Sequence, residues 1–483
     1  MPTSPTTTQP VAVPLCVDLD GTVLRSDLLW ESFVRLLRRN PLYLFAALAW
    51  WCRGRAALKR ELARRVDVPV ETLPYTEALL DFLRAERAAG RPLFLVTASD
   101  ARLAEPVARH LGLFTEVLAS DGQTNLRGNA KARKLVERFG PAGFDYAGNS
   151  AVDLGVWPQA RAGIVVNASP ALARRAARVT TVSHTFGSAP ALARALWTAL
   201  RPHQWVKNLI VFVPLLTSHR LLDRAALAGA AWAAAAFCLC ASAVYILNDL
   251  LDLDHDRQHP TRRLRPLASG QLPLAVGLAL VPTLFAAGLL LGLAWSANLA
   301  LVLAVYAGLT MAYSWRLKQV PLLDAFLLAG FYTIRLVAGH AATGVAYSVW
   351  LLVFAMFLFL SLALVKRFRE LQGLRQRSQT NAAGRGYVTD DLHLVAALGT
   401  SSGYLAALVL ALYVNSQEVR ALYAHPTLLL LGCPLLLFWV SRVWLVAHRG
   451  AMHDDPVVFA LRDWASYVVG ALMLGIIWLA TGW

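Results

Sequence analysis

Charged side chains are scarce in this 483-residue chain, where Asp, Glu, Lys and Arg together make up 16% against about 25% in an average soluble domain. Hydrophobic residues make up 57%, which excludes an ordinary soluble enzyme and a disordered protein. The scarcity is uneven, because residues 1–200 hold 25 basic and 17 acidic side chains whereas the longer stretch 201–483 holds 21 and 13. We therefore predict a soluble part followed by a membrane part.

Cysteine is also scarce, and its five copies include no CxxC pair: Cys16, Cys52, Cys238, Cys240 and Cys433. An odd, scattered set excludes a disulfide framework and a cysteine-ligated metal, so we expect reduced thiols. Residues 1–10 lack a basic stretch ahead of an apolar run, so we expect a disordered leader there and no cleaved signal peptide.

Acidic residues are outnumbered by basic ones, 30 against 46, which gives a formal net charge of +16. A charge of this sign suits nucleic acid or anionic lipid as a partner. The sequence has no basic recognition helix and no basic sheet studded with aromatic residues. We therefore predict a membrane surface as the partner of these cations and no nucleic-acid partner.

Residues 11–180 alternate between short apolar runs, which predict strands, and amphipathic stretches, which predict helices. The strands are expected at 11–17, 92–96, 116–119, 144–147 and 163–167, and helices at 75–89, 101–111 and 130–139. This alternation predicts a Rossmann-like α/β domain with a parallel sheet. A low-complexity stretch near 168–190 leads into a linker, placed at 181–200.

The helix-like stretch from Asp27 to Val68 is expected to form a cap covering about residues 27–75. Inside it, Pro41 to Trp51 is apolar but too short for a bilayer span, which needs ~20 residues. Four arginines flank this segment: Arg38, Arg39, Arg53 and Arg55. Two interpretations stay open, because the segment fits both a helix lying flat on a membrane surface and a buried helix of the cap.

Residues 201–483 are predicted to form an all-α membrane domain with nine transmembrane helices of about 20 residues each. The helices are expected at 204–222, 226–248, 272–294, 297–314, 321–342, 347–366, 393–414, 426–446 and 464–482. Loops after the even-numbered helices hold 15 Lys and Arg, and loops after the odd-numbered helices hold three. The positive-inside rule then predicts an integral protein of a bacterial plasma membrane, with a cytoplasmic N-terminal domain and the C-terminus outside.

An acidic pair directly follows the first predicted strand, in the stretch DLDGT at residues 18–22. Open α/β sheets bind ligands at the carboxyl ends of their strands. Asp18 and Asp20 are suited to act as a nucleophile and as a proton donor to a leaving group. Mg²⁺ would neutralise both carboxylates together with a substrate phosphate, whereas the alternative is an acidic turn that caps a helix.

Later segments add groups suited to the same site: Thr97 ends another strand, Lys131 follows the third, and Asn149 and Asp153 follow the fourth. In this order the motifs resemble those of the haloacid dehalogenase-like phosphohydrolases over about residues 11–180. The resemblance implies four roles: nucleophile for Asp18, general acid and base for Asp20, phosphate binding for Thr97, and stabilisation of the intermediate for Lys131. It also implies Mg²⁺ held by Asp18, Asp20, Asn149 and Asp153. Asn149 stands where that family usually has an acid, so weaker metal binding is expected and a purely structural domain is the alternative.

A second acidic cluster lies at the end of the second predicted span, in the stretch NDLLDLDHDR at 248–257. Four carboxylates beside hydrocarbon are costly unless a cation or ligand compensates them. Asn248, Asp252 and Asp256 are four residues apart and share one helix face, which suits one or two Mg²⁺ and a diphosphate. The alternative is a hydrated loop without metal. Candidate phosphate ligands follow at Arg257, Arg262 and Arg263.

Further candidate binding residues are spread through the membrane part: Lys207, Asn208, Tyr313, Arg316, Lys318, Asp324, Arg335, Lys366 and Arg367. An arginine inside a span, such as Arg335, is a functional candidate by default. The alternative for Arg335 is a structural ion pair with an acid.

The membrane part resembles the UbiA superfamily of prenyltransferases over about residues 201–483, with the motif NDxxDxxxD on Asn248, Asp249, Asp252 and Asp256. That family usually has a second aspartate-rich motif, where this chain has YSWRLK and a lone Asp324. Further stretches are most similar to its decaprenyl-phosphate phosphoribosyltransferase branch: RPHQWVKN, YSWRLK, KRFREL and PVVFALRD.

That branch implies Mg²⁺-dependent transfer of 5-phosphoribosyl from phosphoribosyl pyrophosphate to a polyprenyl phosphate, with Asp249 and Asp252 as catalytic residues. The product keeps a phosphomonoester, which is the substrate type of the first domain. We therefore predict a bifunctional enzyme that transfers the sugar and then removes the 5-phosphate. The alternatives are an aromatic prenyltransferase for a quinone or haem precursor with a regulatory phosphatase domain, and a transporter. An oligomer is compatible with either.

Overall fold

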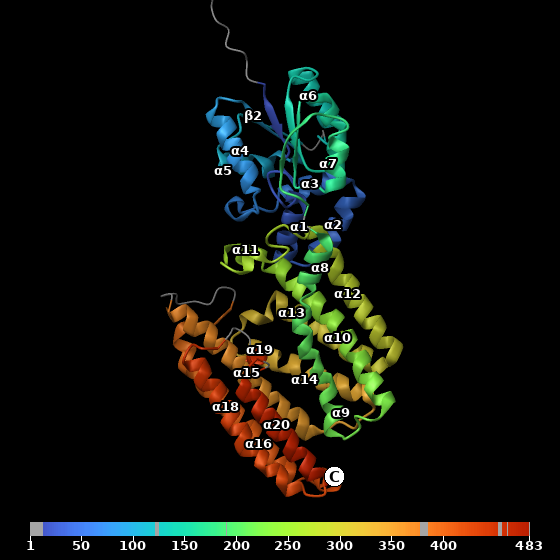
Figure 1. The fold of residues 1–483 in the computed structure, drawn as a ribbon, viewed down its shortest axis with the longest axis vertical. Helices are drawn as coiled ribbons and strands as arrows, with labels where there is room; N and C mark the ends of the chain where they lie inside the picture. The colour runs from blue at the N-terminus through green and yellow to red at the C-terminus, as the bar shows by residue number, and fades with distance from the viewer. Residues whose placement is uncertain are drawn as a thin grey trace, which may run out of the picture. The chain divides into compact units, whose positions relative to one another are not determined.

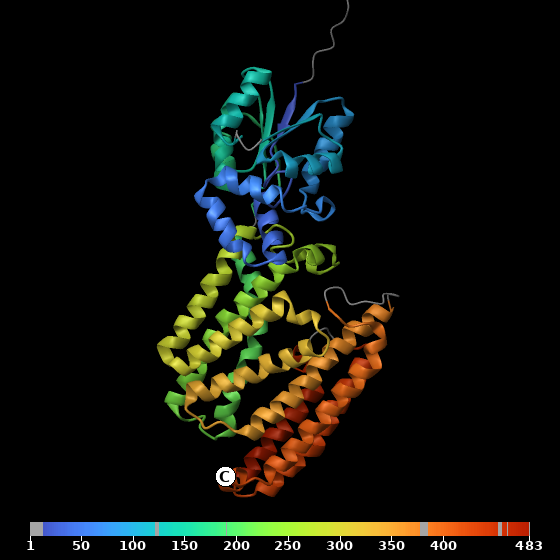
Figure 2. The same cartoon turned by 180° about the vertical axis from the view of Figure 1, so that it is seen from behind.

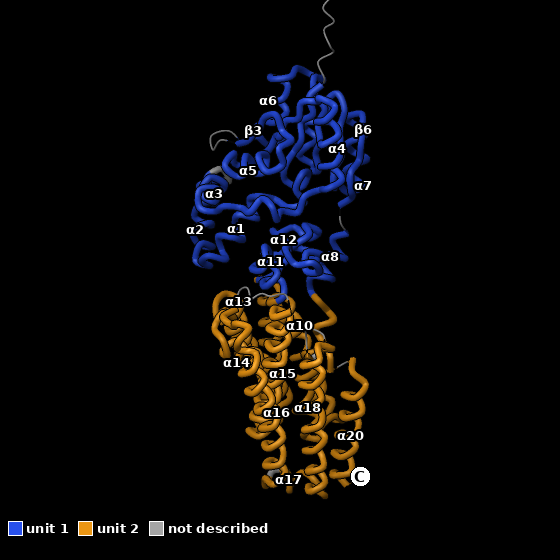
Figure 3. The backbone as a smooth tube through the Cα atoms, turned by 90° about the vertical axis from the view of Figure 1, so that its left-hand side faces the viewer, with its two compact units in different colours: residues 1–200, 245–281 blue, residues 201–244, 282–483 orange. Residues whose placement is uncertain are grey.

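The computed structural model describes residues 13–120, 125–189, 191–376, 385–452, 456–460 and 462–482. The chain forms two compact units, blue and orange in Figure 3: unit 1 comprises residues 1–200 and 245–281, and unit 2 comprises residues 201–244 and 282–483. The aspartate-rich stretch therefore belongs to the same unit as the α/β domain. The expected leader at 1–10 lies outside the described residues.

Unit 1 contains a sheet whose six described strands are all parallel, in the order β3-β2-β1-β4-β5-β6. The strands are β1 (Leu15–Val17), β2 (Leu93–Asp100), β3 (Glu116–Ser120), β4 (Asp145–Gly148), β5 (Gly163–Val166) and β6 (Val182–Phe186). The predicted α/β domain with a parallel sheet is thereby confirmed. Each of the five predicted strands corresponds to one of β1 to β5, with ends that differ by a few residues.

The sheet continues past residue 180, where the domain was expected to end. β6 pairs in parallel with β5, so part of the predicted linker at 181–200 is a strand, and its last part is helix α8 (Leu192–Leu200). β6 is an edge strand whose three central side chains are exposed. An edge strand needs little apolar burial, which is why the polar composition of this segment did not reveal it.

Helices cover both faces of this sheet (Figure 1): α4 (Glu77–Ala88) and α5 (Ala101–Leu111) on one face, α6 (Asn129–Phe139) and α7 (Pro170–Ala176) on the other. Successive strand residues point to opposite faces. Leu15 and Val17 therefore enter one hydrophobic core while Cys16 enters the other. Short 3₁₀ turns follow β4: η2 (Ala151–Gly155) and η3 (Trp157–Gln159).

The expected cap consists of three helices rather than one: α1 (Leu28–Arg39), α2 (Tyr43–Cys52) and α3 (Arg55–Ala63). Pro41 lies in the first break, where it cannot donate a helical hydrogen bond. Gly54 lies in the second, with a φ of +108° that favours glycine. The turn η1 (Val70–Thr72) returns the chain to the sheet.

Unit 1 also contains the ends of two long apolar helices and the segment that joins them. Residues 245–251 form the C-terminal end of α10 (Arg224–Leu251), and residues 274–281 form the N-terminal end of α12 (Leu274–Trp295). Between them lie α11 (Leu253–Gln258) and the turn η5 (Arg262–Leu264). The aspartate-rich motif thus spans the last turn of α10 and the whole of α11.

Unit 2 is helical, and Figure 2 shows α15, α16, α18 and α20 side by side in orange to red. Its longer helices besides α10 and α12 are α13 (Ala297–Trp315), α14 (Leu323–Thr343), α15 (Val349–Gln376), α16 (Leu392–Val414), α18 (Gly432–His448) and α20 (Trp464–Thr481). Its shorter elements are η4 (Pro202–Phe212), α9 (Val213–Thr217), η6 (Leu317–Gln319), η7 (Thr389–Asp391), α17 (Gln417–Leu422), η8 (Pro426–Leu431) and α19 (Pro456–Ala460).

Eight helices in the described part of the chain are long and apolar enough to cross a membrane, and each matches a predicted span. The ninth prediction, 204–222, is not confirmed. This segment folds as the 3₁₀ run η4 followed by the five-residue α9, and Pro214, which has no backbone N–H to donate, lies where η4 passes into α9. It packs on α14, where a Cβ on Gly339 would lie 2.2 Å from the Val211 carbonyl oxygen.

The five cysteines all lie in described segments and are free thiols, as predicted. Cys16 and Cys240 are buried, and Cys52 at the end of α2 is exposed. Burial raises the pKa of the Cys16 thiol to about 12, so this residue is an inert part of the sheet core.

Candidate active sites

The first candidate site lies between β1 and β4, where the strand order of the sheet reverses direction. Asp18 directly follows β1, and Asn149 directly follows β4. Gly21 has a φ of +79°, and a Cβ on it would lie 2.0 Å from the side-chain nitrogen of Asn149. Glycine therefore lets the loop after β1 press against the loop after β4. Doubly wound sheets bind their ligands at this position.

Asp20 is fixed between the end of β2 and the start of α1. Its Oδ2 accepts hydrogen bonds from Ser99 Oγ at 2.6 Å and Thr97 Oγ1 at 3.4 Å, and its Oδ1 accepts one from Leu28 N at 2.8 Å. Burial raises the pKa of Asp20 to about 6, and nearby Asp27 adds to the rise. A rise in this direction suits a group that gives a proton to a leaving group. Ser99 was not among the predicted site residues.

Asp18 is paired with a buried lysine. Lys131, in the first turn of α6, places its Nζ 2.6 Å from Asp18 Oδ1 and donates a second hydrogen bond to Tyr146 Oη at 3.0 Å. Burial raises the pKa of Asp18 to about 7, and Lys131 opposes the rise. The lysine thereby favours the carboxylate form that a nucleophile needs. Tyr146 lies inside β4 and carried no sequence signal of a role here.

Asp153 holds the turn after β4. Its Oδ2 accepts hydrogen bonds from Asn149 N at 3.0 Å, Ser150 N at 2.8 Å and Ser150 Oγ at 3.0 Å, and its Oδ1 accepts one from Tyr146 Oη at 2.9 Å. Both oxygens of this buried carboxylate are therefore engaged by protein donors. These contacts orient Asn149, so Asp153 acts on the site through the turn. Direct metal binding by Asp153 stays a prediction.

The donor set of this site suits Mg²⁺, because carboxylate and amide oxygens are its usual protein ligands. Across the described ranges, no group of three or more His, Cys, Asp and Glu side chains is placed to hold a metal by itself. Asn149, which Gly21 admits to the turn after β1, adds an amide oxygen. Mg²⁺ would then be held by Asp18 and Asn149 together with oxygens of the substrate. Direct binding by Asp20 and Asp153, whose carboxylate oxygens all accept hydrogen bonds from the protein, stays a prediction.

The second candidate site is the aspartate-rich motif of unit 1. Asp252 N donates to Asn248 O at 2.8 Å, and Asp256 N donates to Asp252 O at 2.9 Å. Helical hydrogen bonding therefore continues across the junction of α10 and α11. Asn248, Asp252 and Asp256 share one helix face, as their spacing predicts.

Arg265, which was not predicted as a site residue, joins two carboxylates of this motif. Its Nη1 lies 2.6 Å from Asp256 Oδ2 and 3.1 Å from Asp249 Oδ1. Within the described chain, the buried Asp256 Oδ1 has no hydrogen-bond partner. Burial raises the pKa of Asp256, with Arg265 opposing the rise. A buried carboxylate oxygen without a donor is costly, and a Mg²⁺ held by Asn248, Asp252 and Asp256 would satisfy it.

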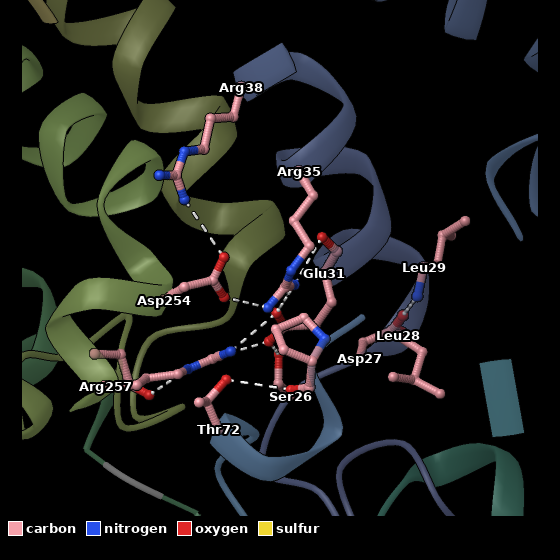
Figure 4. A network of polar contacts seen from close by, with 12 residues as sticks. Ser26, Asp27, Leu28, Leu29, Glu31, Arg35, Arg38, Thr72, Asp254 and Arg257 are labelled. Carbon is pink, nitrogen blue, oxygen red and sulfur yellow. Dashed lines mark hydrogen bonds and ion pairs between the residues drawn. The ribbon is translucent and has the colours of Figure 1, made fainter. Parts of the chain in front are cut away.

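Arg257, a predicted phosphate ligand, contacts the cap (Figure 4). Its Nη2 lies 2.6 Å from Glu31 Oε1, its Nη1 donates to Glu31 Oε2 at 3.1 Å, and its Nε donates to the Ala268 carbonyl oxygen at 3.1 Å. Glu31 is fully buried in α1. Each guanidinium nitrogen thus makes one contact within unit 1, which gives Arg257 a structural role, and phosphate binding by Arg257 stays a prediction. Its neighbours Arg262 and Arg263 are exposed.

The cap makes a second set of ion pairs with α11, also drawn in Figure 4. Arg35 Nη2 lies 2.5 Å from Asp254 Oδ1, and Arg38 Nη1 lies 3.4 Å from Asp254 Oδ2. Arg35 Nη1 also lies 2.6 Å from Glu31 Oε2. Glu31 and Asp254 therefore lie in one charged network that ties α1 of the cap to α11.

Replacing Glu31 with glutamine is expected to cost ~3 kcal/mol, because it leaves buried arginines without their counter-charge. Burial raises the pKa of Glu31, but Arg257 and Arg35 outweigh it and lower this pKa from 4.5 to about 2. The stabilisation is therefore complete above pH 4.5 and is lost as the pH falls towards 2. The melting temperature of the hydrolase domain should shift down by roughly 6–12 °C at pH 7. Glu61→Gln, at an exposed pair with Arg65, is the control, and equal shifts in both variants would contradict the assignment.

Three predicted residues of unit 2 lie close together: Lys207, Asn208 and Arg335, which is inside a predicted span. Arg335 Nε donates to Asn208 Oδ1 at 2.8 Å. Its guanidinium carbon lies 5.4 to 5.7 Å from the ring centroids of Phe237, Tyr306 and Tyr332. Lys207 Nζ lies 5.9 Å from the Tyr332 centroid. Lys207, Asn208 and Arg335 therefore form one cationic cluster among aromatic rings.

Asp324 and Arg367 form a second cluster in unit 2. Arg367 Nε lies 2.5 Å from Asp324 Oδ2, and Tyr387 Oη donates to Asp324 Oδ1 at 2.6 Å. Arg385 Nη1 lies 3.4 Å from Asp324 Oδ2, and Arg367 Nη2 donates to Tyr313 Oη at 3.3 Å. Asp324 is fully buried, so it orients cations rather than presenting a free carboxylate to substrate. Arg385 and Tyr387 were not predicted. The other predicted cations differ in exposure: Arg316 is exposed, and Lys318 and Lys366 are partly buried.

Comparison with known families identifies both parts. Residues 209–462 match the UbiA prenyltransferase family, and residues 15–156 match the haloacid dehalogenase-like hydrolases. The chain belongs to the UbiA prenyltransferase family. It is an integral membrane enzyme of the UbiA type with a haloacid dehalogenase-like hydrolase domain, and both families depend on Mg²⁺.

Relatives of this UbiA protein differ in how much of it they match. An uncharacterized protein of Sinorhizobium fredii is 37% identical over 95% of this chain and 90% of its own length. The nodulation protein NoeC of Azorhizobium caulinodans is 36% identical over 58% of this chain and 92% of its own length. The decaprenyl-phosphate phosphoribosyltransferase of Mycolicibacterium smegmatis is 37% identical over 39% of this chain and 60% of its own length.

Proposed function

We propose that this chain transfers 5-phosphoribosyl from phosphoribosyl pyrophosphate to a polyprenyl phosphate and then removes the 5-phosphate from the product. The choice of donor is supported by the similarity to the phosphoribosyltransferase of Mycolicibacterium smegmatis. The observation that carries the second step is the assembled set of Asp18 with Lys131 and Asp20 with Ser99 in the same chain. A phosphomonoester on the transfer product is the kind of substrate that such a pair of carboxyls hydrolyses.

In the transfer step, a phosphate oxygen of the lipid attacks C1 of the ribose while the bond from C1 to the pyrophosphate oxygen breaks. Mg²⁺ on Asn248, Asp252 and Asp256 would supply the charge that neutralises the leaving diphosphate. Arg265 keeps Asp249 and Asp256 in place. The remaining cations of the proposed binding set are Lys207, Arg262, Arg263, Arg316, Lys318, Arg335, Lys366 and Arg367. Fixed positive charge and positioning supply most of the rate enhancement in this account.

In the hydrolytic step, a carboxylate oxygen of Asp18 attacks phosphorus and the bond from phosphorus to the ribose oxygen breaks. Asp20 gives its proton to that ribose oxygen, as its raised pKa allows. Asp20 then takes a proton from water, which attacks the phosphoryl group on Asp18 and releases inorganic phosphate. Lys131 offsets the charge on Asp18 throughout. Thr97, whose hydroxyl donates to Asp20 Oδ2 at 3.4 Å in the structure, would turn that hydroxyl to a phosphoryl oxygen.

The proposed orientation has the hydrolase domain in the cytoplasm and the C-terminus on the outer side of the plasma membrane. It is supported by the excess of Lys and Arg in the loops after the even-numbered predicted spans. It requires that residues 204–222 carry the chain across the bilayer, although they form no regular spanning helix. It also gives the enzyme access to phosphoribosyl pyrophosphate, which is a soluble cytoplasmic compound.

The donor is tested with purified protein in lipid vesicles containing Mg²⁺ and polyprenyl phosphate. One reaction receives phosphoribosyl pyrophosphate labelled in the ribose, and a parallel reaction receives geranyl diphosphate with a phenolic acid. We expect label in the lipid fraction of the first reaction and no new product in the second. Prenylation of the phenolic acid without labelling of the lipid would overturn the proposal and identify an aromatic prenyltransferase. Turnover in neither reaction would favour a transporter.

A further inference from the structure

Helix α2 exposes an apolar face that the described protein leaves uncovered. Its five large apolar side chains on this face are exposed by 45% to 68%: Leu42, Leu44, Phe45, Leu48 and Trp51. Exposed single leucines are normal on soluble proteins, but a contiguous patch of this kind marks an interaction surface.

The opposite face of α2 is already packed within the cap. Ala47 is buried and Tyr43 and Trp50 are partly buried against α1 and α3, in a small core that includes Leu36 and Leu62. These three positions recur at the spacing of one helix face. The helix is therefore apolar all round, so burial in the cap accounts for only one of its faces.

Arginines border the exposed face at both ends of α2. Arg38 and Arg39 precede the helix and are exposed, and Arg53 follows it and is exposed. An apolar face bordered by cations is the pattern of helices that lie in the plane of a membrane, where arginine contacts anionic headgroups. The ten residues of α2 are about 15 Å long, too short to span the hydrocarbon layer.

The cap is tied to the end of a membrane-spanning helix. α1, which ends four residues before α2 begins, is bound to α11 by the pairs Glu31 with Arg257 and Arg35 with Asp254. α11 begins two residues after the spanning helix α10 ends. The chain also comes close to this segment just before the cap begins, because a Cβ on Gly270 would lie 2.8 Å from the backbone oxygen of Arg25. Gly270 lies four residues before the spanning helix α12 begins.

We propose that the exposed face of α2 lies in the headgroup region of an anionic lipid bilayer and anchors the cap to the membrane surface. Lipid is favoured over a protein partner because the ion pairs of α1 with α11, and the close approach of Arg25 to Gly270, hold the cap within a few residues of spanning helices. The flanking arginines match the negative charge of the lipid headgroups. This placement does not depend on either proposed reaction.

A consequence for catalysis, which rests on the proposed function, follows from α3. Lys59 of α3 donates to the Ala98 carbonyl oxygen at 2.6 Å, in the segment between Thr97 and Ser99 that holds Asp20. An anchored cap would therefore hold the phosphatase loop near the depth at which a lipid-linked phosphomonoester lies.

Nitroxide labels on the full-length protein test this placement. The background carries Cys52→Ala, Cys238→Ala and Cys433→Ala, because Cys16 and Cys240 are buried. One cysteine is then introduced as Phe45→Cys or Leu48→Cys on the exposed face, or as Arg84→Cys on α4, which is exposed in the same unit. The labelled protein is placed in nanodiscs of phosphatidylcholine and phosphatidylglycerol. Collision rates with oxygen, which concentrates in the bilayer, and with a water-soluble nickel chelate are measured, and a melting temperature equal to that of the unlabelled protein shows that each variant is folded.

We expect labels at positions 45 and 48 to collide about ten times more often with oxygen, relative to nickel, than the label at position 84. A ratio at 45 and 48 equal to that at 84 would place the face in water and overturn the proposal. Labels at 45 and 48 that are shielded from both agents would overturn it too, because a second copy of the chain or another protein segment would then cover the face.

Discussion

Replacing Asp18 with asparagine is expected to reduce release of inorganic phosphate by ~10⁴-fold or more, because an amide cannot form the covalent intermediate. Asparagine has nearly the same shape and can still accept the hydrogen bond from Lys131, whose Nζ lies 2.6 Å from Asp18 Oδ1. The loss should therefore come from chemistry and not from misfolding. Phosphate release is measured on the ribosylated lipid and on a small phosphomonoester.

The matched control is Asp81→Asn, at an exposed carboxylate of α4 in the same unit, which should leave phosphate release unchanged. Transfer of ribose to lipid should persist in Asp18→Asn, because the transfer chemistry is assigned to other carboxylates. Phosphate release at the wild-type rate by Asp18→Asn would show that Asp18 is not the nucleophile. It would support the alternative of a purely structural domain, which the presence of Asn149 in place of an acid suggests.

Replacing Asp252 with alanine is expected to lower transfer of ribose to lipid by about 10³-fold. The residue lies at the centre of the helix face shared by Asn248 and Asp256, which hydrogen bonds of 2.8 and 2.9 Å maintain across the end of α10. Losing one carboxylate from a metal site removes several kcal/mol of stabilisation from the negative charge that develops on the leaving diphosphate. Each 1.36 kcal/mol added to the activation free energy slows the reaction tenfold. Transfer is measured with labelled phosphoribosyl pyrophosphate.

Asp223→Asn is the matched control for Asp252→Ala, since Asp223 accepts hydrogen bonds from the first turn of α10 and asparagine keeps the accepting oxygen. Phosphate release from a small phosphomonoester should be unchanged in Asp252→Ala, which shows that unit 1 is folded. Transfer at the wild-type rate by a folded Asp252→Ala protein would contradict the assignment of the aspartate-rich motif to Mg²⁺ and diphosphate. The diphosphate would then have to be bound by the other loops that carry Lys and Arg.

The positions of the residues in the first candidate site could be predicted because the sequence marks them locally. Asp18, Thr97 and Asn149 each follow or end an apolar run that forms a buried strand, and parallel strands bring such ends to one edge of the sheet. Lys131 was harder, because Arg133 and Lys134 beside it have the same charge. Its burial and its contact with Asp18 distinguish it only once α6 packs on the sheet.

Long-range ion pairs could not be predicted from the sequence. Glu31 and Arg257 are separated by 226 positions, and nothing in the sequence around Glu31 distinguishes it from an exposed residue of an amphipathic helix. Arg265 could not be predicted as a partner either, because the positive-inside rule uses loop arginines only to orient the spans. Such partners emerge from tertiary packing.

Apolar composition predicted eight helices that are long and apolar enough to cross a membrane. The segment 204–222 has the same composition but a different local structure, since Pro214 interrupts it and η4 packs closely on Gly339. β6 shows the converse case, in which a polar segment forms a strand because the neighbouring β5 supplies its hydrogen bonds.

The most direct measurement of the central claim follows both labels of one donor in a single reaction. Phosphoribosyl pyrophosphate is labelled with carbon-14 in the ribose and phosphorus-32 in the 5-phosphate, and is incubated with polyprenyl phosphate, Mg²⁺ and the full-length protein. We expect carbon-14 in the lipid and phosphorus-32 in free phosphate, whereas Asp18→Asn should leave both labels in the lipid. Lipid from the wild-type protein that keeps both labels, or that takes up no carbon-14, would contradict the account.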